Sequence, residues 1–166
     1  MVRSHLEYAA PVWSPYYHNL AEELEKIQRR ATKRLPELKD HSYEDRLKRL
    51  KLPTLVYRRI RGDLINVYKY TTGKFKLTSH LKLKESRIHT RGHSMQLEKR
   101  SAKTDRHKYS FSHRVVDWWN RLPEKVVKAP SVNAFKNQLD IHFKDHPVVY
   151  NCKALDCPLS PGISIY

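Results

Sequence analysis

The chain has 166 residues and a formal net charge of +16, with 33 lysines and arginines against 17 acidic residues. This length allows one domain or two small subdomains and excludes two large ones. The excess of positive charge favours an anionic partner, with RNA or DNA as the first candidate. No stretch approaches the ~18 apolar residues of a membrane span, and the start lacks a signal-peptide pattern. We therefore expect an intracellular protein, nuclear or cytoplasmic, with no membrane partner.

The first predicted helix covers residues 18–36 and ends at Pro36. Asn19 is the expected N-cap, with Glu22 in the position of a capping-box partner. Apolar residues recur at helical spacing, which predicts a stripe facing the core; these residues are Leu20, Leu24, Ile27, Ala31 and Leu35.

Two further helices are predicted before residue 74. A short one lies in "SYEDRLKRL" and is capped by Ser42. A longer one lies in "TLVYRRIRGDLINVYKYTTG" and is stopped by Gly73. The apolar stripe of the longer helix consists of Leu55, Ile60, Leu64, Val67 and Tyr68.

Residues 74–108 lose the helical pattern, and together with the helix before them they carry most of the excess positive charge. Residues 53–108 contain 15 basic and 4 acidic residues. Short alternations of apolar and polar residues in 74–108 favour a basic loop or a β-hairpin.

Helical patterns return after residue 108. One helix is predicted from about Ser112 to Arg121, and a second over 131–143, capped by Ser131. Residues 148–166 have no period and several helix breakers, so we expect a poorly ordered tail. The sequence thus predicts a mainly α protein with four consecutive segments, 1–73, 74–108, 109–147 and 148–166.

Two adjacent tryptophans, Trp118 and Trp119, could be core residues or a base-stacking platform. They lie about 100° apart on a helix, so one can face the core while the other lies at its margin. Stacking platforms occur more often on sheets or loops. We therefore interpret the pair mainly as core, and stacking remains the alternative.

The predicted nucleic-acid contacts lie on "YRRIRGD" and the basic segment behind it. The three arginines of that stretch cannot share the face of Leu55, Ile60 and Leu64, so we expect them to project outward and meet phosphates. Such contacts would be largely independent of base sequence and sensitive to salt. The predicted residues are Arg58, Arg59, Arg61, Lys74, Lys76, Lys82, Lys84, Arg87, Arg91, Lys99, Arg100, Lys103, Arg106 and Lys108.

We predict no catalytic residue, no metal and no cofactor. Ser, His and Asp residues are scattered, and the four glycines form no phosphate-binding loop. His142, His146, Cys152 and Cys157 have a spacing that could hold zinc. Such a spacing arises easily by chance in a chain with ten histidines, and it does not change this expectation.

Four blocks, in order, carry a resemblance to a known family: "VRSHLEYAAPVWSPYY", "LEKIQRRATK", "SYEDRLKRLKLPTLVYRRIRGDLINVYK" and "FSHRVVDWWNRLPEKVVKAPSVNAFKNQLD". They resemble the C-terminal region of the reverse transcriptase of LINE-type, non-LTR retrotransposons of the jockey and chicken-repeat group. The resemblance covers the chain from about Val2 to His146.

The resemblance implies thumb-like helices in 1–73 and a region beyond the palm that helps hold template and primer. The palm's paired metal-binding aspartates have no counterpart, because the chain has no Asp-Asp dipeptide. We therefore expect a catalytically inactive fragment of an RNA-directed DNA polymerase whose upstream polymerase domains are missing. The alternatives are a structural or protein-interaction fragment, or an untranslated transposon relic.

Overall fold

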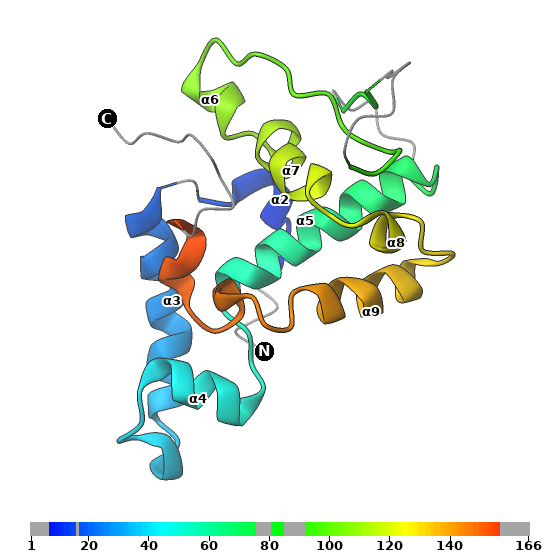
Figure 1. Ribbon diagram of the computed structural model, residues 1–166. Helices are drawn as coiled ribbons and strands as arrows, with labels where there is room; N and C mark the ends of the chain where they lie inside the picture. Colours follow the sequence, from blue (N-terminus) through cyan, green and yellow to red (C-terminus); the bar gives the residue numbers. More distant parts are fainter. Residues whose placement is uncertain (1–6, 16, 76–80, 85–91, 157–166) are drawn as a thin grey trace. The chain divides into compact units, whose positions relative to one another are not determined.

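The structure is a computed structural model that describes residues 7–15, 17–75, 81–84 and 92–156. The regular elements in these ranges are all helices (Figure 1), which confirms the predicted mainly α fold. The chain divides into two compact units. Unit 1 contains Met1–Tyr8, Ser14–Arg59 and Lys144–Tyr166, and unit 2 contains Ala9–Trp13 and Ile60–Phe143. These units group the residues differently from the four consecutive segments, because residues 144–156 belong to the same unit as the N-terminal helices.

Unit 1 is built on three α-helices: α3 (His18–Lys33), α4 (Tyr43–Leu50) and the first turn of α5 (Leu55–Thr71). A 3₁₀ turn, η1 (Pro36–Leu38), joins α3 to α4. The predicted cap of α4 is confirmed, since the Ser42 hydroxyl accepts a hydrogen bond from the amide of Asp45 at 3.1 Å.

Helix α3 has a different N-cap from the predicted one, and its buried face is shifted by one residue, about 100°, from the predicted stripe. Its N-cap is Tyr17, so the prediction of Asn19 as N-cap is wrong. The buried side chains of α3 are polar or small, while the predicted apolar stripe is largely exposed. The buried residues are Ala21, Glu25, Gln28 and Thr32. The physical reason is the bonding of Glu25, which outweighs the hydrophobic pattern.

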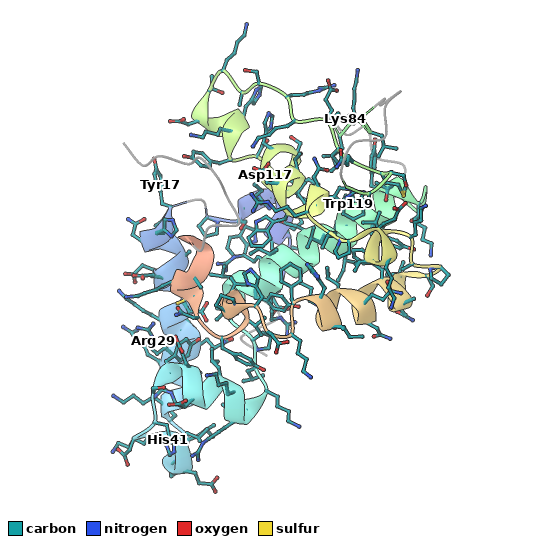
Figure 2. The ribbon with its side chains drawn as sticks, viewed as in Figure 1. Tyr17, Arg29, His41, Lys84, Asp117 and Trp119 are labelled. Carbon is teal, nitrogen blue, oxygen red and sulfur yellow. The ribbon has the colours of Figure 1, made fainter. Side chains whose placement is uncertain are left out.

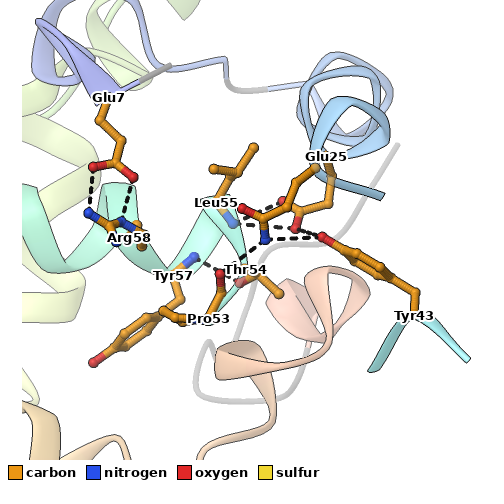
Figure 3. Close-up of polar contacts among 9 residues, drawn as sticks. Glu7, Glu25, Tyr43, Pro53, Thr54, Leu55, Tyr57 and Arg58 are labelled. Atoms are coloured by element: carbon orange, nitrogen blue, oxygen red, sulfur yellow. Dashed lines mark hydrogen bonds and ion pairs between the residues drawn. The ribbon is translucent and has the colours of Figure 1, made fainter. Parts of the chain in front are cut away.

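The carboxylate of Glu25 joins α3, α4 and α5 (Figure 3). Its side chain is fully buried. The Tyr43 hydroxyl donates to Glu25 Oε1 at 2.5 Å, and the Leu55 amide donates to Oε2 at 3.0 Å. The side chain therefore supplies an acceptor to the first amide of α5, a donor that no helical carbonyl can satisfy.

Residue Thr54 completes the same helix start. Its hydroxyl accepts from the Tyr57 amide at 3.1 Å and donates to the Val148 carbonyl at 2.7 Å, while its amide donates to the Val149 carbonyl at 2.8 Å. Val148 and Val149 are buried in the 3₁₀ turn η2 (Pro147–Val149), and a second turn, η3 (Cys152–Asp156), follows. The described part of the predicted tail is thus folded, since residues 148–156 pack in unit 1.

Unit 2 contains α2 (Ala10–Trp13), the rest of α5, α6 (Asp105–Lys108), α7 (Phe111–Asn120), α8 (Glu124–Val127) and α9 (Val132–His142). The predicted stripe of α5 is confirmed for Leu64, Val67 and Tyr68, and for Leu55 in unit 1, which are buried, whereas Ile60 is only half-buried. The stop at Gly73 is also confirmed, because that residue has φ of 69°, which favours glycine. The predicted cap of α9 is present, with the Ser131 hydroxyl accepting from the Ala134 amide at 3.1 Å.

The core of unit 2 forms around Trp119, which has 0% of its surface exposed. Its ring lies 6.0 Å from Phe135 of α9, and Phe135 stacks on Tyr68 of α5 at 4.3 Å. The indole N–H donates to the Met95 carbonyl at 2.8 Å. The neighbouring Trp118 is half-buried against Phe143. The prediction of a core role is confirmed for Trp119, which Figure 2 shows among the packed side chains.

None of the helices in the described part of the chain is both long enough and apolar enough to cross a membrane.

Replacing Trp119 by alanine should reduce the free energy of unfolding by ~3–5 kcal/mol, because the change leaves a cavity and removes the donor to the Met95 carbonyl. Denaturant titration followed by circular dichroism measures the loss. Trp118→Ala is the matched control and should cost clearly less, since that ring is half-buried. Equal losses for both variants would contradict the central role of Trp119.

Glu25 should make the protein less stable as pH rises. Burial raises the pKa of this carboxyl above its ordinary value of 4.5, against the opposing hydrogen bonds from Tyr43 and Leu55 and the charge of Arg59. The folded state therefore holds the proton more tightly than the unfolded state, so this contribution is complete below pH 4.5 and is lost as pH rises through the folded pKa.

The test compares the wild type with Glu25→Gln in urea titrations at increasing pH. The stability advantage of the wild type over the variant should shrink from pH 4.5 upward. An advantage that grows with pH would mean that the hydrogen bonds and Arg59 outweigh burial.

Candidate nucleic-acid interface

The three arginines of "YRRIRGD" do not form the outward-facing cluster that the sequence predicts. Arg59 is buried, with 6% of its surface exposed. Arg58 forms an ion pair with Glu7 at 2.5 Å within unit 1 (Figure 3), and Arg61 forms a two-bond pair with Asp140 at 2.6 and 2.8 Å within unit 2. The prediction that they project outward together is wrong, because carboxylates distant in sequence engage Arg58 and Arg61.

These arginines instead support the folded units. In unit 2 the pair of Arg61 with Asp140 links α5 to α9, and Arg114 donates to Asp63 at 3.0 Å and so links α7 to α5. Arg114 also donates to the carbonyl of Pro11 in α2 at 3.1 Å. Arginine suits such positions because its planar group donates several bonds in a fixed geometry.

The segment from His93 to Lys99, which we call the strap, is fixed along α7 by side chains of that helix. The Asn120 side chain accepts from the Leu97 amide at 2.8 Å and donates to the Leu97 carbonyl at 2.9 Å. Lys99 pairs with both oxygens of Asp117 at 2.8 and 2.9 Å. The strap is thus positioned by residues spaced three apart on one face of α7.

The histidine of the strap is a structural group. His93 is buried, its Nε2 lies 2.9 Å from the Trp119 carbonyl, and its ring meets the indole edge-on. Burial lowers the pKa of His93 below its ordinary value of 6.5. The neutral ring can donate from Nε2 to the carbonyl and so helps to fix the strap on α7.

A second basic stretch pairs with the strap. Leu83 and Leu97 form an isolated antiparallel bridge, with backbone bonds of 2.8 Å from Lys84 to Gln96 and from Glu98 to Lys82. The predicted hairpin therefore exists as one bridge, and the described residues of 74–108 contain no strand. Lys82 and Lys84 are exposed beside this bridge.

Seven of the predicted contact residues are exposed and lie in unit 2. Apart from Lys99, none of these seven forms an ion pair among the described residues, and Lys108 lies 5.4 Å from the ring centre of Tyr109. Figure 2 labels Lys84 near the bridge and Asp117 on α7. The seven are Lys74, Lys82, Lys84, Lys99, Arg100, Lys103 and Lys108.

The other four predicted contact residues lie wholly or partly outside the described part of the chain. Lys76, Arg87 and Arg91 lie outside the described residues, as does the side chain of Arg106. Two acidic residues, Glu98 and Asp105, are also exposed in this part of the chain. The exposed cations still outnumber them, which gives this stretch of unit 2 a positive surface.

Sequence reasoning missed the residues that position the strap. Asp117 and Asn120 flank the two tryptophans in "VVDWWNRL". The prediction for this helix used only its apolar residues. The available signal was their spacing of three residues, which places both on one side of a helix. Which segment they would hold could not be read from that spacing.

A metal centre is not formed by the residues that the structure describes. No group of three or more His, Cys, Asp or Glu side chains lies close enough to hold an ion in that part of the chain. Cys152 is a buried free thiol whose pKa is raised, first by burial and then by the charge of Glu25. Cys157 lies outside the described residues.

Comparisons of the chain with protein-family models, with curated proteins and with solved structures find no match.

Replacing Asn120 by alanine should release the strap. The change leaves the Leu97 amide and carbonyl without their partners, at a cost of about 1–3 kcal/mol. We expect faster hydrogen exchange at the Leu97 amide and faster proteolysis between residues 97 and 104. Asn137→Ala, an exposed position on α9, is the matched control. Equal exchange at the Leu97 amide in the two variants would contradict the role of Asn120 in fixing the strap.

Proposed function

We propose that this chain is a catalytically inactive, nucleic-acid-binding fragment of a LINE-type reverse transcriptase. It contacts RNA or DNA through phosphates, with the exposed cations of unit 2 as its contact residues. In a complete enzyme the same region would help to hold template and primer, beside the upstream polymerase domains.

The observation that carries the binding proposal is the set of exposed cations between Lys82 and Lys108, which, apart from Lys99, form no ion pair with a carboxylate in the described part of the chain. Lys82 and Lys84 lie in the stretch that pairs with the strap, and Arg100 directly follows the strap, while the charged ends of these side chains reach solvent. A phosphate backbone neutralises such charges and releases its bound counterions. The contacts carry no base-specific donor or acceptor pattern, so binding is independent of sequence.

The assignment to reverse transcriptase is supported by the four ordered sequence blocks. Two of these blocks contain residues that hold the helices together. In the third block, Tyr43, Thr54 and Arg61 bond to other elements. In the fourth block, Arg114 bonds to α5 and Trp119 is fully buried. A polymerase centre requires carboxylates that hold two metal ions. The chain has no Asp-Asp dipeptide to supply them, and we therefore propose binding without chemistry.

Binding of single-stranded RNA should weaken steeply as salt increases. Each phosphate contact contributes about 0.7 to the slope of log affinity against log salt. The variant Lys84→Ala/Arg100→Ala/Lys103→Ala should therefore have a slope smaller by up to about 2. Fluorescence anisotropy with labelled oligonucleotides at several salt concentrations measures both quantities.

The matched control removes the same charges from unit 1, as Lys39→Ala/Lys48→Ala/Arg49→Ala, three exposed residues of that unit. We expect this variant to retain most of the wild-type slope. If the slope fell equally in the two variants, RNA binding would depend on net charge alone, and the proposed interface would be wrong. A wild-type protein that does not bind in dilute buffer would favour the alternative, a structural or protein-interaction fragment.

A further inference from the structure

Helix α3 presents an apolar face that unit 1 leaves largely exposed, with Leu24 at its centre half-buried. The helix buries Ala21, Glu25, Gln28 and Thr32. Its larger apolar side chains lie on another face, where Leu20 is 48% exposed and Ile27 39% exposed. Leu35, just beyond the helix, is 43% exposed. Exposed apolar residues in a continuous row mark an interaction surface more often than scattered ones do.

The spacing of this face is that of a helix–helix seam. Leu20, Leu24, Ile27 and Ala31 follow one another at intervals of four, three and four residues. This is the alternation of core positions in a coiled coil, in which residues of one helix insert between those of another. The α3 face, as we call these four residues, therefore fits a second helix laid along it.

The charges beside the α3 face indicate which helix that is. Glu23 and Arg30 are seven residues apart, so they lie on the same flank of the seam, and both are in exposed positions. The first half of α3 carries Glu22 and Glu23, and its last turn carries Arg30 and Lys33. A second α3 in antiparallel orientation would place each Glu23 next to an Arg30, whereas a parallel one would place each Glu23 next to Gln28, which carries no charge.

We propose that two copies of this chain associate through antiparallel α3 helices about a two-fold axis between Leu24 and Ile27. Leu24 of one copy then packs beside Ile27 of the other, and Leu20 beside Ala31. The pair of Glu23 with Arg30 of the second copy occurs twice, as the two-fold symmetry requires. This inference is independent of the proposed nucleic-acid binding, because it rests on unit 1 alone.

The contact is small, so the dimer is reversible. One helix face buries less than the surface of a standard protein interface, which makes association depend on concentration. Within each copy Glu23 already pairs with Lys26 at 2.5 Å, but both side chains are exposed and such a pair contributes little. The flank is therefore available to Arg30 of a second copy.

The first test is sedimentation of the nuclease-treated full chain over a range of concentrations. The mass should rise from 19.8 kDa toward twice that value. Ile27→Asp should remain monomeric with unchanged circular dichroism, because the side chain is exposed in the monomer. A wild-type chain that is monomeric throughout, or an Ile27→Asp variant that associates equally well, overturns the proposal.

The second test reverses the flanking charges. Glu23→Arg alone and Arg30→Glu alone should each raise the dimer dissociation constant about tenfold, because each dimer contains the pair twice. An equal mixture of these two variants should associate again, since every contact between unlike copies is then complementary. The double variant Glu23→Arg/Arg30→Glu should also associate. A mixture that stays monomeric overturns the antiparallel arrangement.

Discussion

The start of α5 is the point on which unit 1 depends. A helix N-terminus leaves amide donors without helical acceptors, and here one acceptor comes from α3 and the other from a residue just before α5 that is itself bonded to a remote segment. Glu25 of α3 accepts from the Leu55 amide, and Thr54 accepts from the Tyr57 amide while bonding to the residues that follow His146. Because these partners lie 30 and 94 residues away from α5's first turn, satisfying one helix end fixes the topology of the unit.

This requirement explains why α3 buries a charged residue. An unpaired buried carboxyl would be costly, but the bonds from Tyr43 and Leu55 offset much of that cost. Turning α3 so that Glu25 reaches α5 moves its leucines to the outer face. The exposed apolar row and the buried polar row are thus two results of the same constraint.

The arginines and lysines of the chain have different roles. Arg58, Arg61 and Arg114 each use a forked side chain to hold a carboxylate within one unit. Most exposed contact residues of unit 2 are lysines, whose compact charge at the end of a flexible stem suits a phosphate backbone that presents no fixed pattern. The net charge of the sequence therefore overstates the charge available to a ligand.

The sequence alone determined the five longer helices but not the four-residue helices α2, α6 and α8, because periodicity and caps such as Ser42 and Ser131 are clear only in the longer segments. It also placed Trp119 in the core and the positive charge in the middle of the chain. Only the tertiary structure decided which face of α3 is buried, which arginines are paired and which residues fix the strap. The reason is that Glu25, Glu7, Asp140 and Asn120 act on partners far away in the chain, and spacing along a sequence carries no information about such distances.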